Sequence, residues 1–196
     1  MTLLACIFAY LLGSVPSGLI LCRTIWHIDI REHGSRNIGA TNVYRTLGKG
    51  PGALVFLLDF LKGFLGVAIA MLLVGTPLAM VLGGIAAILG HSASVFLRFK
   101  GGKGVATGLG VIAMLMPVVT VIVFFAWLLI VFLTRYVSLG SIVGAALVPV
   151  LAFLFDYPTE YTLFGVLAAV LVIVRHHANI GRLLNGTESK IKAGHR

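Results

Sequence analysis

Residues 79–108, AMVLGGIAAILGHSASVFLRFKGGKGVATG, decide the fold class of this chain. The run 79–96 contains no Lys, Arg, Asp or Glu, and a second uncharged run covers 105–133. Apolar segments of this length are typical of transmembrane helices. Between them lies the Lys-Gly loop (residues 97–103), followed by Gly104. Glycines that allow close backbone approach, with lysines beside them, suit phosphate binding. A flexible, positively charged connection between two helices is the alternative.

The composition supports a polytopic membrane protein. Hydrophobic residues make up 59% of the chain, charged residues only 11%, and the mean hydropathy is +1.07. An ordinary soluble domain has about 25% charged residues. The net charge of +9 fits cytoplasmic loops that attract anionic lipid or anionic substrates. Aromatic-interleaved basic patches of the nucleic-acid-binding type are absent, so no nucleic-acid partner is expected.

Seven membrane-spanning helices are predicted within a single integral membrane domain, 1–196. The predicted spans are about 2–24, 51–73, 77–96, 104–116, 117–134, 137–155 and 159–174. The fourth has only 13 residues, fewer than the ≈ 20 normally needed. If the fourth span crosses the membrane, all three polar segments lie on the same side of it: 25–50, 97–103 and 175–196. Every Lys and Arg except Lys62 then lies on that side. The positive-inside rule then predicts an external amino terminus and a cytoplasmic carboxyl terminus.

Two spans contain features that interrupt an ordinary apolar helix. Pro16 lies within residues 13–18, GSVPSG, where a break is tolerated if side chains or a wet cavity satisfy the freed backbone groups. The sequence of residues 13–18 is compatible with a simple helix kink and also with a segment that lines a cavity. Asp59 and Lys62 share one face of the second span. Intramembrane charges suggest function, but an internal structural pair is equally compatible with this spacing.

The polar segment and the carboxyl-terminal tail carry further candidate residues. Residues 34–45, GSRNIGATNVYR, are rich in turn-forming groups, and Thr41 is predicted to cap a short helix that ends before Gly48. The tail begins RHHANIGRL at 175–183. If the last helix continues, Arg175, Asn179 and Arg182 form one stripe, with His176 nearer to it than His177. For the polar segment the alternative is a solvated loop, and for the tail it is a basic anchor for anionic lipid. In the predicted topology all three polar clusters face the cytoplasm and can form one site.

Several catalytic signatures are missing. Lys103 is followed by Gly104, so the loop is not a Walker A motif, and no G-x-S-x-G or H-E-x-x-H sequence occurs. No metal and no cofactor are therefore expected. The remaining cations, hydroxyls, amides and glycines suit a membrane enzyme that acts on a phosphorylated small molecule at the inner face. A membrane transporter of a phosphorylated organic anion is the alternative.

Three motifs, residues 34–45, 90–107 and 175–183, resemble the PlsY family of bacterial acyl-phosphate:glycerol-3-phosphate acyltransferases. The similarity extends to residues 13–18, 59–63 and 186–190. Arg36 stands where this family often has glycine, and Ser94 where it often has proline. The resemblance implies an enzyme of phospholipid biosynthesis in the bacterial inner membrane, with its active site on the cytoplasmic side. It would transfer an acyl chain from acyl phosphate to the 1-hydroxyl of glycerol 3-phosphate, giving lysophosphatidic acid and phosphate.

The resemblance also suggests residue roles, and these complete the predicted site. Arg45 and Lys103, with Ser35, are expected to hold the phosphate of glycerol 3-phosphate. Backbone N–H groups at Gly101, Gly102 and Gly104 would hold the acyl phosphate or the oxyanion. Asn37, Thr41 and Asn42 would shape the loop and bind hydroxyls. His176 and Asn179 would orient the attacking hydroxyl. His91 is a further substrate-binding candidate, although a packed histidine explains its position equally well.

Overall fold

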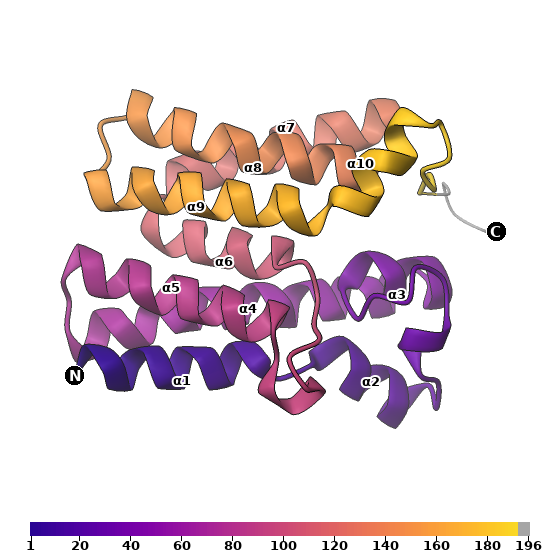
Figure 1. The fold of residues 1–196 in the computed structure, drawn as a ribbon, viewed down its shortest axis with the longest axis horizontal. Helices are drawn as coiled ribbons and strands as arrows, with labels where there is room; N and C mark the ends of the chain where they lie inside the picture. Colours follow the sequence, from indigo (N-terminus) through magenta and orange to yellow (C-terminus); the bar gives the residue numbers. More distant parts are fainter. Residues whose placement is uncertain (192–196) are drawn as a thin grey trace. The chain divides into compact units, whose positions relative to one another are not determined.

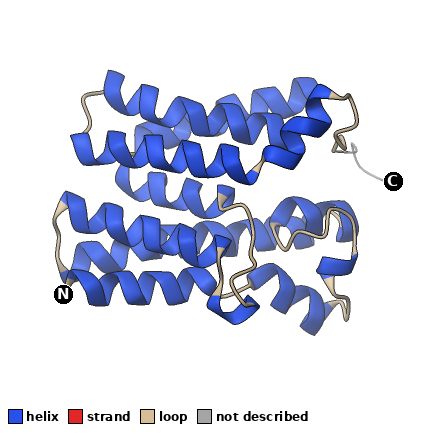
Figure 2. Ribbon diagram, viewed as in Figure 1, coloured by secondary structure: helices blue, strands red, loops and turns tan. Residues whose placement is uncertain are grey.

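The computed structural model describes residues 1–191, which form helices and connecting loops without β-strands (Figure 2). The helices are α1 (Thr2–Ser14), α2 (Ser17–Ile25), η1 (Ile30–Glu32), α3 (Ala40–Leu47), α4 (Lys49–Leu73), α5 (Pro77–Ser92), η2 (Val95–Leu97), α6 (Val105–Leu115), α7 (Pro117–Thr134), α8 (Val137–Leu154), α9 (Thr159–Arg175) and α10 (His177–Leu184). The predicted all-α class is confirmed.

Within residues 1–191, five continuous or nearly continuous helical segments are long and apolar enough to cross a membrane. They are Thr2–Ile25, Lys49–Leu73, Pro77–Leu97, Pro117–Thr134 and Val137–Leu154. The pair α9 and α10, bent by 61°, qualifies as a sixth if it is counted as one span. Helix α6 is apolar but short. Seven crossings and the orientation of the termini stay predictions.

The chain divides into two compact units, Met1–Met114 and Leu115–Arg196. In the first unit α1, α4 and α5 pack against one another, and α2 and α3 lie at one end, where both contact α4 (Figure 1). In the second unit α8 packs against α7 and α9. The single-domain organisation stays a prediction.

The first span is broken at Val15 and Pro16, and its exposed carbonyls are satisfied by side chains from other helices. Lys62 Nζ donates to the carbonyl of Val15 at 2.6 Å, and Ser94 Oγ donates to the carbonyl of Ser14 at 2.5 Å. Lys62 also pairs with Asp59 at 2.6 Å, and both side chains are buried. The structure therefore favours the internal-pair interpretation of Asp59 and Lys62, because the pair caps a helix break.

Glycines let the helices of the first unit approach through their backbones. A Cβ at Gly13 would overlap the backbone of Ala87, and one at Gly63 would overlap the carbonyl oxygen of Thr107. Small residues at helix contacts are a recurrent feature of membrane proteins, because lipid supplies no hydrophobic force between helices and close packing must replace it. These contacts fix α1 against α5 and α4 against the start of α6.

The polar segment is an ordered structure with its own apolar base. Ile30, Ile38 and Val43 are buried against residues of α2 and α4. Helix α3 ends before Gly48, as predicted, and Gly48 has a φ of 97°. The predicted cap was wrong, because Gly39 occupies the N-cap position in an extended conformation and Thr41 lies in the first turn. Glycine is accepted at an N-cap, so the helix begins two residues earlier than expected.

Candidate functional site

Asn42 organises the loop that leads into α3. Its Oδ1 accepts a hydrogen bond from the backbone N–H of Ser35 at 2.8 Å, and its Nδ2 lies 2.8–3.1 Å from the carbonyls of Ile30, His33 and Asn37. Because the buried amide uses both its oxygen and its nitrogen inside the loop, the structure supports a loop-shaping role. A contact between Asn42 and substrate stays a prediction.

The other predicted residues of this segment lie on either side of Asn42 in the sequence. Asn37 Oδ1 accepts from the backbone N–H of Gly39 at 2.9 Å, which holds the extended residue before α3. Ser35 is exposed, whereas Thr41 and Arg45 are half-buried on α3. Arg45 lies in the last turn of that helix. The structure therefore brings Ser35, Asn37, Thr41, Asn42 and Arg45 together within one ordered segment.

The Lys-Gly loop folds onto the carboxyl-terminal end of α5. The backbone N–H of Gly102 donates to the carbonyl of His91 at 3.0 Å, and Gly101 and Gly102 pack against the backbone and ring of this histidine. His91 is buried, and its Nδ1 lies 3.7 Å from Asp59 Oδ1. The loop thus rests on the buried group Asp59, Lys62 and His91, so His91 is a supporting residue in the structure. A substrate contact by His91 stays a prediction.

Lys103 and Gly104 lie where the loop turns into α6. Lys103 is half-buried, and Gly104 is buried with a φ of 76°. This backbone conformation is in the region that favours glycine. The predicted anion-binding groups Gly101, Gly102, Lys103 and Gly104 therefore form one continuous turn, held at one end by α5 and at the other by α6.

Replacing Gly101 with alanine is expected to lower the activity about a hundredfold. The added Cβ would overlap the backbone of His91 and Ser92, which cannot move as a flexible side chain could. A displacement of about 1 Å at a reacting group costs on the order of 10²-fold in rate. Gly50→Ala is the matched control, because a Cβ there meets no atom within 4 Å. Initial rates of both variants check this expectation, and equal rates would contradict it.

In the second unit His176 lies at the bend between α9 and α10. The chain bends by 61° here, so the last helix does not continue straight, and the condition for a stripe of Arg175, Asn179 and Arg182 is not met. His176 is buried and its Nδ1 lies 2.8 Å from the carbonyl of Val172. A carbonyl can only accept, so Nδ1 carries hydrogen and Nε2 is the basic nitrogen of the neutral ring. His177 is exposed, and the preference for His176 stays a prediction.

Glu188 is a site residue that the predicted set did not include. Its Oε1 accepts from Ser138 Oγ at 2.8 Å and from Asn179 Nδ2 at 2.7 Å, and its Oε2 pairs with Arg182 Nε at 2.7 Å. The buried carboxylate thereby ties the tail to α8 and α10 and orients the amide of Asn179. The sequence signal that could have indicated Glu188 is that it is the single acidic residue of the basic tail, 175–196.

The stability of the second unit is expected to depend on the ionisation of Glu188. Burial alone raises the pKa of Glu188, but hydrogen bonds from Asn179, Ser138 and Arg182, with the charge of Arg182, outweigh it and lower the pKa below its usual 4.5. The carboxylate therefore stabilises the fold above about pH 4.5, and this contribution is lost as the pH falls through the folded-state pKa. Thermal unfolding of the parent and Glu188→Gln between pH 3 and 7 checks this, because the difference between them should shrink at low pH. A constant difference would contradict the expectation.

A second charged group lies in the polar segment of the first unit. Asp29 binds Arg31 and Arg23, each at 2.6 Å. The hydrogen bonds from Arg31, reinforced by Arg23, hold the pKa of the Asp29 carboxyl well below its usual range. This exposed pair of arginines is neutralised only in part, because two positive charges share one carboxylate.

The fold and the polar clusters define an all-helical integral membrane protein with an ordered, cationic and glycine-rich loop system. Residues 3–186 match the family model described as glycerol-3-phosphate acyltransferase. A relative in Carboxydothermus hydrogenoformans, named glycerol-3-phosphate acyltransferase, is 48% identical over 97% of both chains. A relative of the same name in Desulforamulus reducens is 47% identical over 97% of this chain and 95% of its own.

Two crystal structures are also similar to this chain. One is PlsY, an integral membrane glycerol 3-phosphate acyltransferase, in its glycerol 3-phosphate form, with a TM-score of 0.93, 44% identity and coverage of 97% of this chain and 96% of that one. The lysophosphatidic acid form has a TM-score of 0.91, 43% identity and coverage of 97% and 95%. The chain belongs to the glycerol-3-phosphate acyltransferase family.

Proposed function

We propose that this protein transfers a fatty acyl chain from acyl phosphate to the 1-hydroxyl of glycerol 3-phosphate. The observation that carries the proposal is the family match over residues 3–186, which includes all of the predicted site residues. The glycerol 3-phosphate and lysophosphatidic acid forms of the similar PlsY structures support the acceptor and the product. The family match also disfavours the transporter alternative.

The chemistry balances without a covalent enzyme intermediate. The hydroxyl oxygen attacks the carbonyl carbon of acyl phosphate, an ester bond forms, and the bond from that carbon to the phosphate oxygen breaks. Inorganic phosphate leaves, and the hydroxyl proton passes to a base. Acyl phosphate is a mixed anhydride with a good leaving group, so direct attack is compatible with the lack of a serine or cysteine nucleophile motif.

In the first unit we assign the phosphate of glycerol 3-phosphate to Arg45 and Lys103, with Ser35. Arginine can hold a phosphate through two parallel hydrogen bonds, and lysine adds a mobile point charge. Backbone N–H groups of the turn at Gly101, Gly102 and Gly104 suit the acyl phosphate or the developing oxyanion. Asn37, Thr41 and Asn42 are assigned to loop shape and hydroxyl binding, and His91 to support of the turn or substrate contact.

In the second unit we assign the attacking hydroxyl to His176 and Asn179. The hydrogen bond from Nδ1 to Val172 favours the tautomer whose Nε2 can accept a proton. Glu188 holds Asn179, and so it acts as a positioning residue. Two acceptors are available for the hydroxyl proton, Nε2 of His176 and the departing phosphate.

The proposed setting is the bacterial inner membrane, with seven crossings and the reaction on the cytoplasmic side. The distribution of Lys and Arg supports this arrangement. The acyl tail would lie among apolar helix surfaces in the bilayer, and its phosphate would reach the polar segments. Membrane lipid is the only other expected partner.

The proposal is tested with purified protein, labelled glycerol 3-phosphate and three acyl donors of equal chain length. The donors are acyl phosphate, acyl-CoA and acyl carrier protein loaded with the acyl chain. Lysophosphatidic acid should form only with acyl phosphate. Product from either thioester donor would refute the donor assignment. Absence of product from all three donors would refute the activity, and flux of intact glycerol 3-phosphate into sealed vesicles would then establish the transporter alternative.

The proton acceptor is tested by the pH dependence of the rate for the parent and His176→Gln. If His176 is the base, the variant should lose the acid limb of the profile and at least about a hundredfold in rate, because general base catalysis contributes about 10²–10⁴-fold. His177→Gln is the matched control, since this neighbouring ring is exposed. A near-normal rate with an unchanged acid limb in His176→Gln would exclude His176 as the base.

A further inference from the structure

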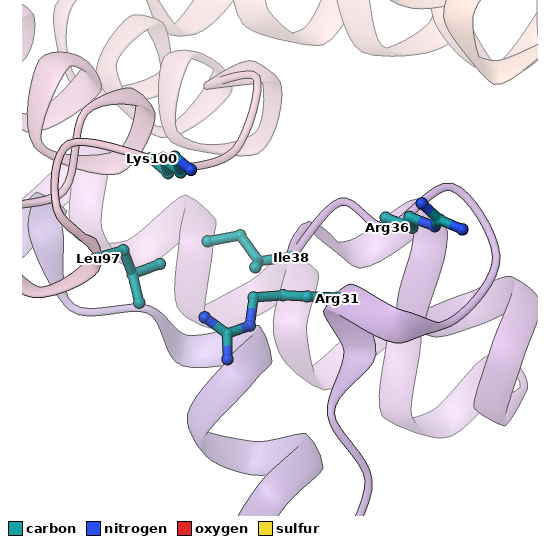
Figure 3. A pocket seen from close by; sticks show the side chains of 6 residues that line it. Arg31, Arg36, Ile38, Leu97 and Lys100 are labelled. Carbon is teal, nitrogen blue, oxygen red and sulfur yellow. The ribbon is translucent and has the colours of Figure 1, made fainter.

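A cationic pocket lies in the first unit, between the polar segment and the Lys-Gly loop. Its volume is about 260 Å³, and it is lined by Arg31, Arg36, Ile38, Leu97, Lys100 and Gly101 (Figure 3). Three of these six residues carry a positive charge and none carries a carboxylate. Figure 3 shows that the cations come from two segments distant in the sequence, Arg31 and Arg36 from one and Lys100 from the other.

The positive charge of this pocket is only partly compensated. Arg31 binds Asp29 through both carboxylate oxygens, at 2.9 Å and 2.6 Å, but Arg23 shares the same carboxylate. The side chains of Arg36 and Lys100 form no ion pair within residues 1–191. Arg36 and Lys100 thus add two positive charges to the lining of one cavity that has no acidic lining residue, which favours the binding of an anion.

Backbone strain marks both edges of the pocket. Arg36 has a φ of 58°, and Arg98 and Phe99, beside Lys100, have φ values of 51° and 59°. Residues other than glycine rarely adopt this left-handed conformation, and it persists only where surrounding structure requires it. The strained turn at Arg36 places a long cation at a position where glycine would be conformationally easier.

The apolar part of the pocket indicates what kind of anion it takes. Ile38 and Leu97 line the pocket itself, and Phe96 and Phe99, the sequence neighbours of Leu97 and Lys100, are 59% and 67% exposed. A small soluble phosphate would contact the cations and leave this apolar edge uncovered. A phospholipid would satisfy both, with its phosphate among the cations and its glycerol and acyl region against the phenyl rings. Aromatic and basic residues together are typical of membrane interfaces.

We propose that the pocket formed by Arg31, Arg36 and Lys100 binds the headgroup phosphate of an anionic membrane phospholipid. The cations of this site differ from those assigned to acyl transfer, because neither Arg36 nor Lys100 has a role in the proposed reaction, and Gly101 borders both sites. Three residues of the Lys-Gly loop, Leu97, Lys100 and Gly101, line the pocket, so a bound lipid would contact the loop that carries Lys103. The proposal concerns binding and is measured without reference to acyl transfer.

Native mass spectrometry of the full chain in an uncharged detergent tests the proposal. Phosphatidylglycerol is the probe, and phosphatidylcholine with the same acyl chains is the zwitterionic control. Lys100→Gln and Arg36→Gly should each bind phosphatidylglycerol about fivefold more weakly than the parent, as expected for loss of one interfacial cation. Arg36→Gly also relieves the strained φ, so its thermal midpoint should equal or exceed that of the parent. Weaker binding would then not reflect misfolding.

Arg98→Gln is the matched charge control, since Arg98 is exposed in the same loop but does not line the pocket. It should retain parental phosphatidylglycerol binding. Parental binding in both Lys100→Gln and Arg36→Gly would overturn the proposal, and so would an equal loss in Arg98→Gln. Displacement of the lipid by millimolar inorganic phosphate, but not by acetate at equal ionic strength, would overturn it in favour of a soluble phosphate ligand.

Discussion

Replacing Lys62 with methionine is expected to lower the free energy of unfolding by about 3–5 kcal/mol, the range found when one member of a buried ion pair is removed. The buried side chain of Lys62 is the partner of Asp59 and also caps the carbonyl of Val15 at the break in the first span. Methionine preserves the apolar stem but supplies no donor. The variant therefore leaves both a buried carboxylate and a buried carbonyl without their partner. Detergent-denaturation curves of the purified protein measure the effect.

The double variant Asp59→Asn/Lys62→Met separates charge imbalance from loss of packing. It removes both charges, so it should be clearly more stable than Lys62→Met alone, because most of the cost arises from the unpaired carboxylate. Lys49→Met is the control on the same helix, since Lys49 is exposed. A denaturation midpoint of Lys62→Met equal to that of Lys49→Met would show that the buried pair does not stabilise the break.

Replacing Arg45 or Lys103 with alanine is expected to weaken the affinity for glycerol 3-phosphate roughly 10- to 150-fold. This range follows from the loss of one charged hydrogen-bonding contact, about 1.5–3 kcal/mol. Both side chains are half-buried at the two polar clusters of the first unit, Arg45 in the last turn of α3 and Lys103 beside the turn of glycines. Equilibrium binding of labelled glycerol 3-phosphate measures the change directly.

The control and the conservative variants sharpen this second prediction. Lys49→Ala removes an exposed cation four residues from Arg45 and should bind as the parent does. Arg45→Lys should restore less affinity than its charge would suggest if the phosphate is held through two parallel hydrogen bonds, because lysine cannot reproduce that geometry. Parental affinity in both Arg45→Ala and Lys103→Ala would contradict the assigned phosphate site.

The helices were predictable because their signals are local. The predicted span 117–134 agrees with α7, and 77–96 begins with α5 at Pro77. Proline at the first helical position, glycine after the last and long uncharged runs all act within a few residues. The end of α3 before Gly48 follows from the same chemistry, because a φ of 97° suits glycine.

The partners within the site were not predictable because they are distant in sequence. Lys62 reaches Val15 across 47 positions, and Glu188 meets Ser138 across 50. No spacing rule connects such pairs. The bend at His176 was missed for a related reason, since neither proline nor glycine marks it. The left-handed conformation of Arg36 is not indicated by arginine itself, which usually avoids it, although the glycine that the family often has at this position suits it.

The close backbone contacts at Gly13 and Gly63 have a consequence for protein engineering. These helix contacts are made by small residues, so the large apolar side chains on the outer surface of the helices take no part in them. Leu57, Leu61 and Leu65 of α4 are exposed, whereas Gly63 on the same helix lies against Thr107. Outward-facing leucines can therefore be exchanged for polar residues independently of the helix contacts. A water-soluble form of the first unit is a realistic design target, provided that its buried glycines are left unchanged.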